Sequence, residues 1–468
     1  MSSLSLRSPL TVVRAGALAG LSFVVCLLLF GLPHLGIQTS DDAATLAAAV
    51  AWWERGSPAI SHMRWLNERV EIGREGRDGE LYTKYGIGQI GLGAALYGLG
   101  RTSLPRGAAF DWAGFRLARS LPAAQLAQWL NVLLGGLVVA LVVYAVGRRA
   151  GLSAAALGGA LLATASPFWL ASRGFGSEVG ASLGLLVAVL LADAGLRSSR
   201  RGLLTLSALA VVAAALFRPS ALVFAVAYLA WLWGRPRRDW LGVGLALSVS
   251  IATLVGYNFY RYGTLWDGGY SGGFQLQWIG VVGNLVSPGR GLLFFAPWTL
   301  AFIPAARHGL ARRRAFWLGL SLGVAAFFLF HAMWREWEGG WAYGPRLLIP
   351  LLPVLAAATA AYLVRRPLLA AVMWAFGFLA QVATLRLDPI VTHDQVIREG
   401  GIAFDQTVWS LGDSILAHQL RVGLGALVVA WLLILALAAA VAVVAWQVHT
   451  TRGLAVGEGK MGDPDAFT

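Results

Sequence analysis

The sequence has few charged residues. Only 13% of its 468 residues are charged, while 57% are apolar, and a soluble domain normally carries about 25% charged residues. A water-soluble globule could not bury this much apolar surface, which excludes an ordinary soluble enzyme or binding domain. Several apolar stretches instead approach or exceed the ~18 residues that mark a membrane-spanning helix, the first at 15–33 and the longest at 422–446.

Cysteine and lysine are almost absent. Cys26 is the single cysteine, so a disulfide within the chain and a cysteine-based metal site are both excluded. Lys84 and Lys460 are the only lysines, and the net charge of +14 comes from arginine. These arginines stand in short clusters between apolar stretches, which is how membrane topology is encoded. We therefore expect a membrane protein with no nucleic-acid partner.

Sequence motifs for nucleotide binding, repeats and metal binding are also missing. The sequence contains no phosphate-binding loop of the nucleotide type and no dinucleotide fingerprint, which argues against work driven by nucleotides. No fixed-period repeat is present, and no His/Cys/Asp cluster has the spacing of a metal site. The sequence indicates no cofactor with certainty, and a divalent metal stays open.

The apolar stretches predict an all-α polytopic membrane protein with about twelve transmembrane helices. The expected helices are 15–33, 124–147, 152–171, 179–196, 202–217, 219–233, 240–259, 290–306, 315–333, 347–363, 368–385 and 422–446. Both termini are cytoplasmic if each short arginine cluster lies inside, as the positive-inside rule asks. Residues 1–446 then form one transmembrane domain, and 447–468 form a disordered cytoplasmic tail.

The loops on the outer side are expected to carry the polar chemistry. The longest is the first extracytoplasmic loop, 34–123, in which 86–100 predicts a helix lying at the membrane interface. Five acids face the cytoplasm on this topology, namely Asp193, Asp239, Glu458, Asp463 and Asp465, which leaves 18 of the 23 acids outside or at the outer membrane edge. A pore or pump would usually place ionisable groups at mid-membrane, so this distribution favours work at the outer surface.

Asp41 and Asp42 are the first acids after the first apolar helix, and an apolar helical stretch follows them directly. One interpretation is structural, because Ser40 or Asp41 could cap that helix by accepting backbone N–H groups. The other is catalytic, because a carboxylate at the membrane edge can act as a general base on a hydroxyl within hydrogen-bond reach. We favour Asp42 slightly, since a capping Asp41 would be partly committed to the backbone.

Three cations are candidates for binding a phosphate group: Lys84, Arg290 and Arg346. Arg290 lies in a glycine-rich turn before an apolar helix, where free backbone N–H groups also attract anions. The structural alternatives are a lysine that snorkels to the interface and an arginine that bonds nearby carbonyls. Candidates for contacts to a sugar or an acceptor are Tyr85, Glu178, Glu336, Glu338 and Trp341. The tryptophans around 334–341 are equally typical of an aromatic membrane belt.

Together these elements resemble the GT-C glycosyltransferases, in particular the branch similar to protein O-mannosyltransferases and aminoarabinose transferases (glycosyltransferase family 39-like). The resemblance covers most of the chain up to about residue 380. It rests on three short motifs: Asp41-Asp42 after the first helix, Lys84-Tyr-Gly-Ile-Gly88, and Leu216-Phe-Arg-Pro-Ser220. The second of these lacks the proline pair of the family. The segments 116–149, 287–297 and 339–353 also resemble parts of family members.

The resemblance implies a GT-C-like helix bundle and an inverting glycosyltransferase. Such an enzyme moves a sugar from a polyprenyl-phosphate carrier to a lipid, glycan or protein acceptor. It further implies the bacterial inner membrane, with the active site facing the periplasm. Two alternatives stay open. A flippase or transporter for lipid-linked sugars would need charges along the helix centres and often repeat symmetry. A non-catalytic scaffold for envelope assembly would need neither the acidic pair nor the outer arginines.

Overall fold

The computed structural model describes residues 9–33, 36–37, 39–103, 122–198, 200, 202–385 and 388–423. Within these residues nearly all regular structure is helical, as the sequence predicts. One short antiparallel hairpin pairs β1 (Gly73–Glu75) with β2 (Leu81–Thr83). The expected twelfth helix, apart from its first two residues, and the tail 447–468 lie outside the described residues.

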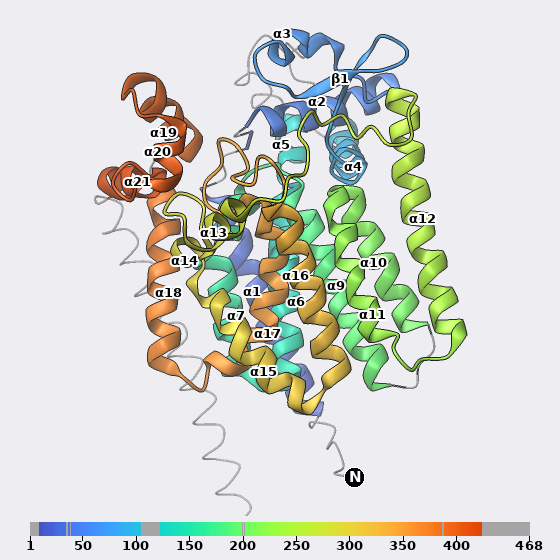
Figure 1. The fold of residues 1–468 in the computed structure, drawn as a ribbon, viewed down its shortest axis with the longest axis vertical. Coiled ribbons are helices and arrows are strands. Elements are labelled where there is room, and N and C mark those ends of the chain that lie inside the picture. The colour runs from blue at the N-terminus through green and yellow to red at the C-terminus, as the bar shows by residue number, and fades with distance from the viewer. Residues whose placement is uncertain are drawn as a thin grey trace, which may run out of the picture.

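Seven helices in the described part of the chain are long and apolar enough to cross a membrane. Helices suit this role because they satisfy their own backbone hydrogen bonds, which lipid cannot do. The seven are α1 (Pro9–Gly31), α5–α6 (Pro122–Gln128 and Leu130–Ala150), α9 (Glu178–Arg197), α12 (Arg237–Tyr262), α16 (Arg314–Ala332), η5–α17 (Arg346–Leu351 and Leu352–Leu363) and α18 with η6 (Pro367–Val382 and Ala383–Leu385). The protein is therefore a polytopic helical membrane protein, shown in Figure 1 with its long helices roughly parallel.

Shorter apolar helices complete the bundle, and prolines interrupt two that were expected to be continuous. Proline lacks the N–H that a helix interior needs. A break at Pro167 divides the expected helix 152–171, and a break at Pro297 divides the expected helix 290–306. The short helices are α7 (Leu152–Thr164), α8 (Phe168–Arg173), α10 (Leu203–Phe217), η3 (Pro219–Ala227), α11 (Tyr228–Trp231), α14 (Leu292–Phe295), η4 (Pro297–Ala301) and α15 (Phe302–Arg312).

The segment after α1 builds a cap on one end of the bundle, at the top of Figure 1. It contains α2 (Ser40–Arg55), η1 (Ser61–Met63), α3 (Arg64–Asn67), the β1–β2 hairpin and α4 (Ile87–Ser103). Helix α4 covers the helix expected at 86–100, and it packs on α2 around a separate apolar core. The cap therefore holds the start of α2 rigidly above the long helices.

Two further groups of elements lie at the same end. The first group is helix α13 (Trp278–Val286), which comes before α14 in the chain. The last described elements are α19 (Pro389–Asp394), the π-helical turn η7 (Gln395–Glu399), α20 (Phe404–Trp409) and α21 (Ile415–Gly423). Figure 1 shows α19 to α21 together beyond the end of α18. The cap, α13 and α19 to α21 therefore share one end of the bundle.

Candidate active site

The site begins at the first turn of α2. Thr39 is the N-cap, and its hydroxyl oxygen accepts a hydrogen bond from the backbone N–H of Asp42 at 3.0 Å. The sequence suggested Ser40 or Asp41 for this role, and that suggestion was wrong. Capping by Thr39 leaves the acidic pair in the first helical turn, where the positive end of the helix dipole favours negative charge.

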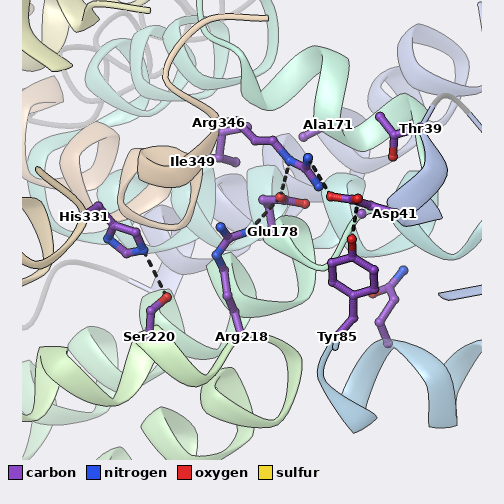
Figure 2. A network of polar contacts seen from close by, with 12 residues as sticks. Thr39, Asp41, Tyr85, Ala171, Glu178, Arg218, Ser220, His331, Arg346 and Ile349 are labelled. Carbon is purple, nitrogen blue, oxygen red and sulfur yellow. Dashed lines mark hydrogen bonds and ion pairs between the residues drawn. The ribbon is translucent and has the colours of Figure 1, made fainter. Parts of the chain in front are cut away.

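Asp41 and Glu178 are joined through one arginine (Figure 2). The Arg346 guanidinium lies 2.9 Å from Asp41 Oδ2 and donates through Nε to Glu178 Oε1 at 2.7 Å. Arg218 donates to the same Glu178 oxygen at 2.7 Å, and the Tyr85 hydroxyl donates to Asp41 Oδ1. These five side chains come from five separate segments of the chain, which makes their convergence a tertiary feature.

The network sits at the edge of the buried region. The Glu178 side chain is only 3% exposed, whereas those of Arg218, Arg346 and Asp41 are 18%, 22% and 25% exposed. A buried carboxylate is costly unless it is paired, and two guanidinium groups provide that pairing for Glu178. Burial, and next the charge of Asp41, raise the pKa of the Tyr85 phenol well above its usual value. Tyr85 is therefore a neutral hydrogen-bond donor at any physiological pH.

A small cavity opens beside this network. Its volume is about 60 Å³, and its polar lining includes Asp42, Glu178 and Arg346, with Trp341 on its wall. At about 30 Å³ per water in the liquid, such a cavity holds roughly two water molecules. Asp42 is buried, and it is Asp42 rather than Asp41 that lines this cavity.

Lys84 and Trp341 lie close to the network. The Lys84 ammonium is 5.9 Å from the ring centre of Tyr85 and 5.4 Å from that of Tyr270, both cation–π distances. Trp341 also packs against His393, with ring centres 5.5 Å apart. Of the residues singled out in the sequence, the structure thus brings together Asp41, Asp42, Lys84, Tyr85, Glu178, Trp341 and Arg346.

Arg290 has a different environment. It is fully buried, and its guanidinium donates to the backbone carbonyls of Glu338, Gly289 and Gly340 at 2.9 Å each. Burial lowers its pKa to about 10, which still leaves it charged at neutral pH. Arg290 therefore fixes the loop that leads to Trp341 and Arg346, through the carbonyl bonding that was the structural alternative for it.

Glu336 and Glu338 contribute to this region mainly through their backbone carbonyls. The Glu336 carbonyl accepts from Gly339 N at 3.0 Å, and the Glu338 carbonyl is a partner of Arg290. Burial raises the pKa of the Glu338 carboxyl. Within the described ranges, neither side chain bonds to Asp41, Glu178 or Arg346. Their proposed contact with a sugar or acceptor stays a prediction.

Arg218 is the network residue that sequence reasoning passed over. It stands at the break between α10 and η3, where Ser220 contacts His331 Nε2 at 3.1 Å and ties the turn to α16 (Figure 2). An arginine between two apolar helices is expensive unless it has a function or a partner. That rule could have marked Arg218, although not its partner Glu178. Among the described residues, no group of three or more His, Cys, Asp or Glu is arranged to hold a metal ion.

The fold and the network define a polytopic helical membrane protein with a paired acid–arginine site at one end of its bundle. No family model matches the chain, and no curated protein matches it. The chain is similar to the crystal structure of ArnT from Cupriavidus metallidurans in the apo state, with 18% identity, a TM-score of 0.48, and coverage of 89% of this chain and 75% of that one. The corresponding values for the crystal structure of ArnT bound to undecaprenyl phosphate are 15%, 0.44, 89% and 76%.

Proposed function

We propose that the protein is an inverting glycosyltransferase of the GT-C class that transfers a sugar from a polyprenyl-phosphate carrier to an acceptor hydroxyl at the outer face of the membrane. The observation that supports it most is the network of Asp41, Glu178, Arg218 and Arg346 beside the cavity at Asp42. Carboxylate and guanidinium groups lie together at the end of an apolar bundle. A lipid phosphate and a hydroxyl from the aqueous side can meet there.

Asp42 is the proposed general base. A base must reach the hydroxyl that it deprotonates, and Asp42 lines the cavity whereas the two Asp41 oxygens contact Arg346 and Tyr85. Asp41 is the proposed positioning residue, because it holds Arg346 in place. The first turn of α2 thus supplies one carboxylate for proton transfer and one for orienting a cation.

Arg346 and Lys84 are the proposed phosphate contacts. A guanidinium can bind two phosphate oxygens at once. Arg346 contacts Asp41 through one terminal nitrogen and Glu178 through Nε, which leaves part of its five N–H donors for a ligand. Lys84 adds a point charge near Tyr85. Arg290 acts in this proposal through the loop that its guanidinium fixes, since its three nitrogens already donate to carbonyls.

The proposed reaction is a single displacement. Asp42 accepts the proton of the acceptor hydroxyl as its oxygen forms a bond to the anomeric carbon of the sugar. The bond from that carbon to the phosphate oxygen breaks, and its electron pair leaves with the polyprenyl phosphate. The leaving group needs positive charge and no proton, so Arg346 and Lys84 suffice to stabilise it. Inversion follows because attack and departure occur on opposite faces.

The cavity must enlarge before a sugar can enter, since about 60 Å³ accommodates only a few waters. Its lining includes Trp341, Ala342 and Tyr343 from the loop before η5, and Pro389 and Ile390 from the start of α19. Both groups belong to segments outside the long helices. Movement of these segments is consistent with loops that close over a substrate in other enzymes. Donor binding is therefore expected to reorder the chain around Trp341.

The test is turnover in vitro with a panel of radiolabelled polyprenyl-phosphate sugars and the full chain in membranes. Transfer of label from one donor, with inversion at the anomeric carbon, would support the proposal. Retention, or labelled donor that only changes leaflet, would contradict it. The outer location is tested separately by cysteine labelling in a background that lacks Cys26. A cysteine at Gly401 should label from outside, and one at Arg313 should label only from inside.

A further inference from the structure

A second, larger cavity lies at the bundle end opposite the candidate active site. This cavity has a volume of about 710 Å³ and is bordered by the ends of α6 and α9, by α15 and α16, and by the end of α17. It therefore falls in the size range of sites for small ligands, about 300–1,000 Å³. Figure 1 shows α15, one of the helices that border it, at the lower end of the bundle. The proposed glycosyl transfer uses none of its residues.

One buried acid organises the cations of this cavity. Asp193 is 1% exposed, and its carboxylate contacts Arg149 at 2.5 Å, Arg197 at 3.1 Å and Arg313. The side chains of these three arginines are 39%, 40% and 28% exposed, respectively. Asp193 therefore fixes the position of three guanidinium groups, while part of each stays accessible from the cavity.

Positive charge in the cavity is far from balanced. Arg312, Arg365 and Arg366 also line it, and Asp193 is the only acid among the lining residues. Six arginines against one aspartate give a charge of 6 − 1 = +5. Cations held this close repel one another, and an anion that enters would relieve that repulsion. Arginine is also the side chain best suited to bind phosphate through two hydrogen bonds.

The remaining wall of the cavity is apolar. It includes Val146, Leu190, Trp317, Leu320 and Val354. A small hydrophilic anion would gain nothing from such a wall, whereas a molecule with a phosphate head and a hydrocarbon chain would use both parts. Basic pockets between transmembrane helices on the cytoplasmic side are a recurrent kind of site for anionic lipid headgroups.

We propose that this cavity is a binding site for an anionic phospholipid, with its phosphate among Arg312, Arg313 and Arg366 and part of an acyl chain against the apolar wall. The positive-inside rule alone explains arginines at this end. It requires neither a cavity of this size nor a buried carboxylate that gathers three of them. If the arginines are only topology signals, replacing those that line the cavity should affect lipid binding no more than replacing other arginines at this end. A lipid site predicts a larger effect at the lining arginines.

The test uses the full chain in a neutral detergent and measures lipid binding by native mass spectrometry and by the shift in melting temperature. Phosphatidylglycerol is expected to bind and to raise the melting temperature, whereas phosphatidylcholine and inorganic phosphate are not. Equal binding of phosphatidylcholine would show that the cavity takes any lipid. Equal protection by inorganic phosphate would show a site for a free anion. Either result overturns the proposal.

The decisive variant is Arg312→Gln with Arg366→Gln, because both side chains line the cavity and neither contacts Asp193. It should weaken phosphatidylglycerol binding by about 25-fold, at roughly fivefold for each arginine near a lipid phosphate. The matched control is Arg237→Gln with Arg238→Gln, two exposed arginines at the start of α12 that do not line the cavity. Equal loss in both double variants would show general attraction and overturn the site. The double lysine variant at 312 and 366 should retain most of the binding.

Discussion

Both ends of the bundle contain a cluster of arginines around a buried carboxylate, but the arrangement is reversed between them. At the cap end, Arg346 bridges two carboxylates, Asp41 and Glu178. At the opposite end, Asp193 holds three arginines. The first cluster has as many acids as cations if Asp42, Arg218 and Lys84 are counted with it, whereas the second has a large positive excess. The first can offer a proton acceptor beside a phosphate contact, and the second can offer only attraction for an anion.

The sharpest difference between the ends should appear when an acid loses its charge. Asp42→Asn keeps the shape of the side chain and removes the base, so turnover is expected to fall by about 10²–10⁴-fold. Stability should change little, because Thr39 rather than Asp42 caps α2. The measurement is single-turnover transfer from a polyprenyl-phosphate sugar.

Glu54→Gln is the matched control for that prediction. Glu54 lies at the other end of α2 and pairs with Arg101 at 2.8 Å. This variant should retain normal turnover. Near-normal turnover in both Asp42→Asn and Asp41→Asn would show that the acidic pair is structural. Glu178, Glu336 and Glu338 would then be the remaining candidates for the base.

Two arginine-to-lysine variants separate binding from folding at the cap end. Arg346→Lys removes the bridge between Asp41 and Glu178, so the apparent affinity for the lipid donor should fall by about 10- to 100-fold, as expected when a charged hydrogen-bonded contact is lost. Arg290→Lys cannot reach three carbonyls at once, so it should lower the free energy of unfolding by about 3 kcal/mol. Donor titration and thermal unfolding of both variants give the comparison. The reverse pattern would place the phosphate at Arg290.

Asp193→Asn tests whether the opposite end contributes to catalysis. Three arginines would lose the carboxylate that they share, so the free energy of unfolding should fall by about 2–3 kcal/mol. This loss is smaller than for a fully buried ion pair, because the arginines are partly exposed. Turnover at saturating donor should stay within about twofold, since no proposed catalytic group lies at this end. Asp239→Asn, at the start of α12, is the control for removing one acid from the same end. A loss of turnover without a loss of stability would show that the two ends are coupled.

The sequence predicted the fold better than it predicted the contacts. Apolar length marked the spanning helices because lipid leaves a helix few alternatives. The interruptions at Pro167 and Pro297 were missed because a membrane helix can continue through a proline when neighbouring groups bond to the backbone carbonyls that it leaves free. The acidic pair, Glu178 and Arg346 were found individually, whereas the connection of Asp41 to Glu178 through Arg346 depends on segments more than a hundred residues apart.

Arg290 and Arg218 show most directly which side-chain contacts cannot be predicted from the sequence. Arg290 has the sequence context of a phosphate ligand, but its burial against three carbonyls becomes visible only in three dimensions. Arg218 lies in the motif Leu216-Phe-Arg-Pro-Ser220, which contributed to the family resemblance but gave Arg218 no role by itself, yet it is one of the two arginine partners of Glu178. Local sequence reports which side chains are costly to bury, and the tertiary fold decides which of them meet.

Tyr85→Phe is expected to have the smallest effect, and it tests whether Asp41 orients Arg346 or acts as a base. The phenol donates to Asp41 Oδ1, and losing one such bond should lower kcat/KM by about three- to tenfold, or ~1 kcal/mol. Because burial and Asp41 raise the pKa of Tyr85 well above its usual value, the phenol stays protonated throughout the working range. Its removal should therefore leave the alkaline limb of the pH–rate profile unchanged. Tyr97→Phe is the matched control, because Tyr97 donates in the same way to Glu54 at 2.9 Å on the far end of α2, and it should have no effect on transfer. An alkaline limb that shifts in Tyr85→Phe alone would make Tyr85 a participant in proton transfer and would contradict a purely orienting role for the Tyr85–Asp41 pair.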